Sequence, residues 1–106
     1  MVRDSYGGVD CVVRDNLISR GAATGVTEAV AVRGQFTLTG NTISGFDEEG
    51  AVALALYPDR AGRELYPVIL RNIIQRCARA VGEAQPGLWS ATRPADNLFL
   101  QCGATP

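Results

Sequence analysis

A recurring frame around asparagine constrains the fold of this chain more than any other feature. Asn16, Asn41, Asn72 and Asn97 follow one another at spacings of 25, 31 and 25 residues. The column two positions after each asparagine holds Ile18, Ile43, Ile74 and Phe99, and the column three positions before it holds Val13, Leu38, Ile69 and Pro94. Mostly polar residues stand between these columns, so the pattern predicts a short strand, a turn at the asparagine and a second strand.

A second apolar block follows the frame and predicts a further strand in each repeat. In the segment 51–57, AVALALY, large residues alternate with alanine, and we expect the alanines to face outward. A repeat of about 25 residues with two or three strands is typical of a solenoid coil, whose strand edges pair with the next coil. The sequence therefore predicts one all-β domain over residues 1–106, a parallel β-helix of about four coils.

The segment 65–84 also fits a helix, because its apolar residues recur at helical spacing. Pro67 interrupts that pattern, and the segment shares the frame of Asn41, so strands are favoured over the helix. The longer spacing of 31 residues indicates an insertion in the segment 57–67, which contains two prolines, a glycine and four charged residues. Insertions in solenoids form loops, which often build the binding face.

Composition excludes several functions within this chain. All ten basic residues are arginine and histidine is absent, which excludes lysine bases, histidine metal sites and Ser-His-Asp triads. The net charge of −1 gives no electrostatic basis for binding nucleic acid or an anionic membrane. No apolar run approaches the roughly 20 residues of a membrane span.

The compartment stays open on sequence grounds. The N-terminal residues lack the basic and apolar regions of a signal peptide. The chain either stays in the cytoplasm or is part of a longer secreted protein, which would place it in the extracellular space or the periplasm. The second alternative is favoured, because neither end carries a capping repeat. For the same reason we expect the ends to meet adjoining β-helix coils or to associate end to end.

Four segments carry a family resemblance, namely VVRDNLISRG, FTLTGNTISGF, VILRNIIQRC and PADNLFLQCG. They resemble the right-handed parallel β-helix repeat of pectate-lyase-like proteins and of carbohydrate-binding and sugar-hydrolysis domains, over residues 9–103. The resemblance implies a right-handed parallel β-helix that is often extracellular and often faces polysaccharide. It does not imply one activity, because the fold hosts lyases, hydrolases, adhesins and scaffolds.

Several repeated positions are interpreted as structural. The amides of Asn16, Asn41, Asn72 and Asn97 are expected to bond from coil to coil as a ladder, with each asparagine in the left-handed conformation that a tight turn needs. Cys77 and Cys102 share a column in adjacent coils. They are close enough for a disulfide but fit better as buried thiols, because parallel stacked Cβ vectors make the torsion awkward. Arg71 and Asp96 share another column and could form an exposed ion pair.

The acidic cluster Asp47, Glu48 and Glu49 is a weak candidate for Ca²⁺, which some β-helix lyases use to bind uronate substrates. Metal sites usually draw ligands from several coils, whereas a single coil contributes here. A solvated turn is therefore the favoured interpretation, and no cofactor is expected.

Aromatic and arginine residues of two loops are the candidate ligand-binding residues. The set consists of Tyr57, Tyr66, Arg60, Arg63 and Trp89. Aromatic rings stack on the apolar faces of sugars, and arginine forms bidentate contacts with carboxylate or sulfate groups. The competing interpretation of Trp89 is a hydrophobic plug over the open end of the coils.

The favoured function is a non-catalytic β-helix scaffold or a carbohydrate-binding module. The alternative is the C-terminal fragment of a polysaccharide lyase or glycoside hydrolase that acts on acidic polysaccharide, with its catalytic coils outside this chain. No catalytic residue is assigned, because neither a lysine partner nor a paired set of carboxylates is evident.

Overall fold

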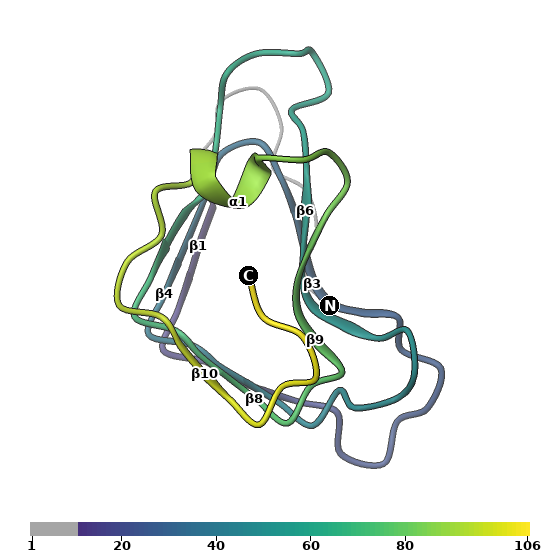
Figure 1. Ribbon diagram of the computed structural model, residues 1–106. Coiled ribbons are helices and arrows are strands. Elements are labelled where there is room, and N and C mark those ends of the chain that lie inside the picture. The colour runs from purple at the N-terminus through teal and green to yellow at the C-terminus, as the bar shows by residue number, and fades with distance from the viewer. Residues whose placement is uncertain (1–10) are drawn as a thin grey trace.

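The computed structural model describes residues 11–106, apart from the side chain of Cys11. The chain winds into a parallel β-solenoid of about four turns with a three-sided cross-section, and Figure 1 looks down its axis. The chain runs counter-clockwise toward the viewer in Figure 1, which is the sense of a right-handed turn. The predicted all-β fold of stacked coils is confirmed, and strands β7, β8 and β9 occupy the segment that also fitted a helix.

Each side of the solenoid is one parallel sheet that takes one strand from each coil. The first contains β1 (Cys11–Arg14), β4 (Phe36–Thr39) and β7 (Val68–Leu70); the second contains β2 (Leu17–Ser19), β5 (Thr42–Ser44), β8 (Ile73–Gln75) and β10 (Leu98–Leu100); the third contains β3 (Glu28–Arg33), β6 (Val52–Tyr57) and β9 (Arg79–Glu83). Equivalent positions lie in register. Ile43, for example, pairs with Ile18 below and Ile74 above.

The core fills the interior of the three-sided stack. Leu38, Ile43, Ile69 and Ile74 are at most 1% exposed, and they come from the columns on either side of the asparagine. Burial of apolar area at roughly 25 cal/mol per Å² makes these columns the main source of cohesion between coils.

The prediction that the alanines of the segment 51–57 face outward is only partly confirmed. Ala51, Ala53 and Leu54 all belong to the buried core cluster, whereas Ala55 does not. Two successive inward residues, Ala53 and Leu54, are possible where the strand bends, since strict alternation holds only along an undistorted strand. The outer face of β6 therefore presents Val52, Ala55 and Tyr57.

The four asparagines form a continuous hydrogen-bond ladder at the corner between the first two sheets. The backbone N–H and the side-chain Nδ2 of Asn41 both donate to Oδ1 of Asn72, at 3.0 and 3.1 Å. Asn16 donates to Asn41 and Asn72 to Asn97 in the same way. The Nδ2 of Asn41 also donates to the carbonyl oxygen of Val13 in the coil below, at 2.8 Å. The buried amides are thus paired within the stack, as buried polar groups require.

The left-handed residue of this corner is not the asparagine, as the sequence had suggested. It is the residue before it: Asp15, Gly40, Arg71 and Asp96 have φ between 54° and 69°. Among the described residues no ion pair joins Arg71 to Asp96, so the expected exposed pair does not form. The chain must turn before the asparagine, because the asparagine's own backbone N–H is needed for the ladder.

Two segments depart from the regular coil. Residues 58–67 form a loop between β6 and β7 that projects beyond the outline of the coils at the top of Figure 1. In the next coil a single-turn helix, α1 (Leu88–Ala91), occupies the corresponding corner, and Leu88 reaches the core. Within residues 11–106 no helix has both the length and the apolar character to cross a membrane.

Candidate functional site

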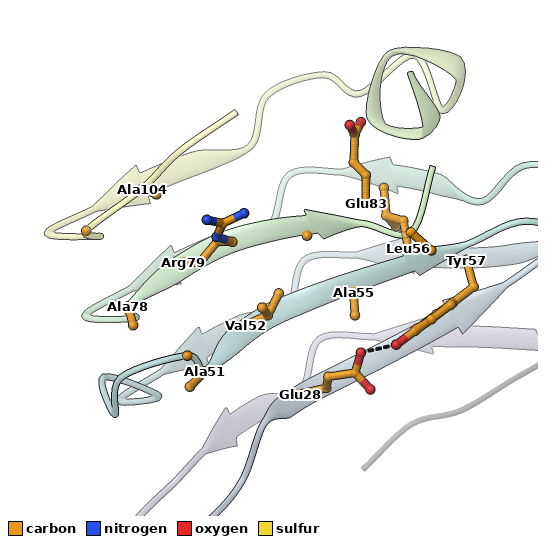
Figure 2. Close-up of a pocket in the computed structure, with 14 residues that line it drawn as sticks. Glu28, Ala51, Val52, Ala55, Leu56, Tyr57, Ala78, Arg79, Glu83 and Ala104 are labelled. Atoms are coloured by element: carbon orange, nitrogen blue, oxygen red, sulfur yellow. Dashed lines mark hydrogen bonds between the residues drawn. The ribbon is translucent and has the colours of Figure 1, made fainter. Parts of the chain in front are cut away.

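A hollow lies on the outer face of the third sheet, along β6 and β9. Its volume is about 570 Å³. Figure 2 shows the residues that surround it. We call it the outer groove, and it is lined by Glu28, Gly50, Ala51, Val52, Ala55, Leu56, Tyr57, Ala78, Arg79, Gly82, Glu83, Ala84, Gly103 and Ala104.

The outer groove exists because small residues occupy the middle of this sheet face. Ala55 pairs with Gly82 in the neighbouring strand, so the floor is made of side chains that rise little above the backbone. A Cβ atom added at Gly82 would lie 3.1 Å from Cγ1 of Val52. Any larger residue there would crowd Val52 and fill the hollow.

Tyr57 and Glu28 are hydrogen-bonded to each other at the lower wall of the outer groove. The Tyr57 hydroxyl donates a hydrogen bond to the carboxylate of Glu28, which lies one coil below (Figure 2). The guanidinium carbon of Arg33 lies 5.0 Å from the centre of the Tyr57 ring, and Nη1 of Arg33 donates to the carbonyl oxygen of Pro58 at 3.0 Å. A cation over the ring and a bond to the hydroxyl fix the orientation of the tyrosine.

Arg79 and Glu83 mark the upper rim of the outer groove at the two ends of β9. The Arg79 guanidinium is exposed and makes no ion pair or hydrogen bond within residues 11–106. The Glu83 carboxylate accepts a hydrogen bond from the backbone N–H of Trp89 at 2.7 Å. The groove therefore offers an unpaired guanidinium beside two hydrogen-bonded carboxylates.

The predicted ligand-binding residues are not brought together. Tyr57 lines the outer groove, whereas Trp89 lines a separate hollow of about 350 Å³ with Arg79, Val81, Glu83 and Pro106. The Trp89 ring packs against the core and against Phe99, with 6.0 Å between ring centres. That position at the last coil is the one the plug interpretation expects.

The remaining predicted residues lie on the loop 58–67, outside the lining of the outer groove. Arg60 and Tyr66 are exposed there. Arg63 is tied to Asp59 by two hydrogen bonds, from Nε at 3.0 Å and from Nη2 at 3.1 Å. These bonds hold the pKa of the Asp59 carboxyl below its ordinary value of 3.8 and raise the pKa of Arg63.

The acidic cluster contacts an arginine of the preceding coil. Arg20 contacts Asp47 at 3.3 Å and Glu48 at 2.9 Å, and Glu48 also accepts a bond from the backbone N–H of Gly25. Within residues 11–106 no group of three His, Cys, Asp or Glu side chains is placed to hold a metal ion.

Cys77 and Cys102 are both free thiols in neighbouring coils. Burial raises the pKa of the Cys77 thiol, and the neighbouring Cys102 raises it further. A raised pKa keeps the thiol protonated at neutral pH, which suits a small apolar core residue and not a nucleophile.

The sequence missed Glu28, Arg79, Gly82 and Glu83 as groove residues. Counting from each asparagine could not have stacked them, because the paired residues Glu28, Val52 and Arg79 stand 12, 11 and 7 positions after their asparagines. Comparison with protein-family models, with curated proteins and with solved structures finds no match to this chain.

Proposed function

We propose that this chain is a non-catalytic, carbohydrate-binding β-helix module of the pectate-lyase-like type, and that the outer groove is its binding site. The observation that carries the proposal is a groove with a floor of small residues beside the unpaired guanidinium of Arg79. A flat apolar floor at Ala55 and Gly82 suits the apolar face of a sugar ring, and the groove follows neighbouring strands in the way that an extended chain requires.

The rim determines which sugars fit best. Arginine recognises carboxylate and sulfate groups with paired, geometrically defined hydrogen bonds, so Arg79 favours an acidic polysaccharide. Glu83 can accept bonds from sugar hydroxyls with the carboxylate oxygen that the Trp89 backbone N–H does not use.

Binding is favoured over catalysis by the state of the Glu28 and Glu83 carboxylates. A glycosidase needs one carboxylic acid and one carboxylate placed on either side of the scissile bond. Here Glu28 is bonded to Tyr57 and Glu83 to the backbone of Trp89, so both already serve structural contacts.

Calorimetric titration with oligogalacturonides of increasing length, and with a neutral glucan for comparison, tests the proposal. Gly82→Leu fills the floor and Arg79→Gln removes the cation, and we expect each to weaken binding of the acidic oligomer by about tenfold or more. Arg93→Gln, at an exposed arginine outside the groove, is the matched control and should bind normally.

Circular dichroism confirms that each variant retains its β structure before its affinity is compared. Unchanged affinity in both groove variants would rule out this site, and absence of binding to either glycan would leave the scaffold role alone. Release of unsaturated or reducing-end products during the titration would instead support the lyase or hydrolase alternative.

A further inference from the structure

The asparagine ladder has a direction, and its two ends are chemically different. In every rung the backbone N–H and Nδ2 of one asparagine donate to Oδ1 of the asparagine in the next coil toward the C-terminus. The ladder is therefore a chain of amides that all point the same way.

At the C-terminal end the ladder is left with donors. Nδ2 of Asn97 donates one hydrogen bond, to the carbonyl oxygen of Ile69 at 3.0 Å, although an amide has two protons to donate. Neither the second proton nor the backbone N–H of Asn97 has an acceptor among the described residues.

At the N-terminal end the ladder is left with an acceptor. Asn16 donates to Asn41 and to the carbonyl oxygen of Arg14, but its own Oδ1 accepts no bond within residues 11–106. Asn97 and Asn16 occupy the same position in the repeating cross-section. One end of the ladder therefore has unpaired donors at the place where the other end has an unpaired acceptor.

The strands beside the ladder are incomplete at the same two ends. β10 and β2 are the outermost strands of their sheet, so each has one edge without a partner strand among the described residues. Their inward residues, Phe99 and Ile18, are half-buried, whereas Ile43 in the middle of the column is 1% exposed. The column beside them ends in Leu17, which is 73% exposed, and Leu98, which is 50% exposed.

The C-terminal tail leaves this edge uncovered. Ala104 bridges to Arg79 of β9, and Pro106 lies by Arg79, Val81 and Trp89. The tail therefore joins the third sheet at β9 and then ends at the centre of the cross-section, away from β10 (Figure 1). Figure 1 shows the tail leaving β10 and turning inward beside β9.

We propose that copies of this chain stack head to tail, with β10 of one copy pairing in parallel with β2 of the next. Asn97 then donates from its backbone N–H and Nδ2 to Oδ1 of Asn16 in the next copy, which repeats the internal rung. Leu98 meets Leu17 of that copy and continues the outer apolar column. Such a contact is heterologous and does not close, so it produces oligomers that lengthen with concentration.

Sedimentation velocity of the full chain over a range of concentrations tests the stacking. Wild-type protein should form a series of oligomers. Leu17→Lys blocks only the N-terminal end and Leu98→Lys only the C-terminal end. Each should raise the concentration needed for association by at least about tenfold, because each replaces an apolar contact between the copies with a charged side chain.

Mixing these two variants distinguishes head-to-tail stacking from other arrangements. The Leu17→Lys copy keeps an intact C-terminal end and the Leu98→Lys copy an intact N-terminal end, so the mixture should form a 1:1 dimer and nothing larger. Thr42→Lys places the same charge in the same column within a middle coil and should assemble like wild type.

Three results would overturn the proposal. They are a wild-type chain that stays monomeric at every concentration, a Leu17→Lys variant that still dimerises through its C-terminal ends, and a mixture that does not associate. Loss of assembly in Thr42→Lys would point to side-by-side packing of the sheet faces.

Discussion

The middle coils and the end coils of this solenoid are built from the same frame but are satisfied to different degrees. Asn41 and Asn72 are buried and bonded above and below, whereas Asn16 is exposed and Asn97 bonds only downward. This difference shows that a coil in this fold depends on its neighbours. They supply the hydrogen-bond partners and the burial of its strand edges, which its own side chains cannot provide.

The largest expected difference in stability between middle and end coils comes from replacing an asparagine of the ladder. Asn72→Leu leaves the buried backbone N–H of Asn41 without its acceptor and removes the bonds that Asn72 donates to Leu38 and Asn97. The unsatisfied N–H and the lost bonds together should lower the free energy of unfolding by about 4 kcal/mol. Urea denaturation measures this loss.

Replacing the asparagine at the end of the ladder should lower the free energy of unfolding far less. Asn16→Leu leaves the exposed Asn16 backbone N–H still able to donate to Asn41, so a loss below about 1 kcal/mol is expected. Equal losses at positions 16 and 72 would contradict the difference between middle and end coils.

A smaller difference in stability is expected between alanine substitutions at two isoleucines of one inward column. Ile43→Ala removes a fully buried side chain and should destabilise the protein by about 3 kcal/mol, whereas Ile18→Ala, in the half-buried end coil, should cost about 1 kcal/mol. Thermal unfolding of both variants checks this. If head-to-tail assembly is present, the cost at Ile18 should grow with protein concentration.

The smallest expected effect is a difference in acid sensitivity between the coils and the loop 58–67. The folded pKa of Asp59 lies below its ordinary value because of Arg63, so its contribution is present above about pH 4 and is lost as the pH falls through the lowered pKa. Hydrogen exchange at about pH 2–3 should show the loop 58–67 losing protection while the ladder keeps it, because asparagine amides do not titrate.

Asp59→Asn is the control for that acid effect. It should show the unprotected loop already at neutral pH, with little further change in acid. Simultaneous loss of protection in the loop and the ladder would mean that acid acts on the whole coil.

The sequence contained the repeat, the inward columns and the ladder, because each is a local signal that recurs at fixed spacing. It did not reveal the outer groove, because the outward positions differ between coils. Val52 in one coil lies beneath Arg79 in the next, and neither residue is distinctive alone.

Two details of the coil differ from the pattern that the sequence predicts, and both follow from how the coil closes. The bend that turns both Ala53 and Leu54 inward is not encoded by alternation, since it follows from closing the coil. The left-handed residue was assigned to the asparagine on propensity alone, although the hydrogen bond from the asparagine's backbone N–H places the turn one residue earlier, as at Gly40.

The loop between β6 and β7 has a consequence for how this protein can change. Leu38 still pairs with Ile69, and Leu56 with Glu83, on either side of the extra residues. Loop length is therefore uncoupled from strand register, and doubling the length of a flexible loop costs only about 0.6 kcal/mol. This corner can accept a longer, shorter or foreign segment while the stack stays the same, which makes it the natural graft point of the molecule.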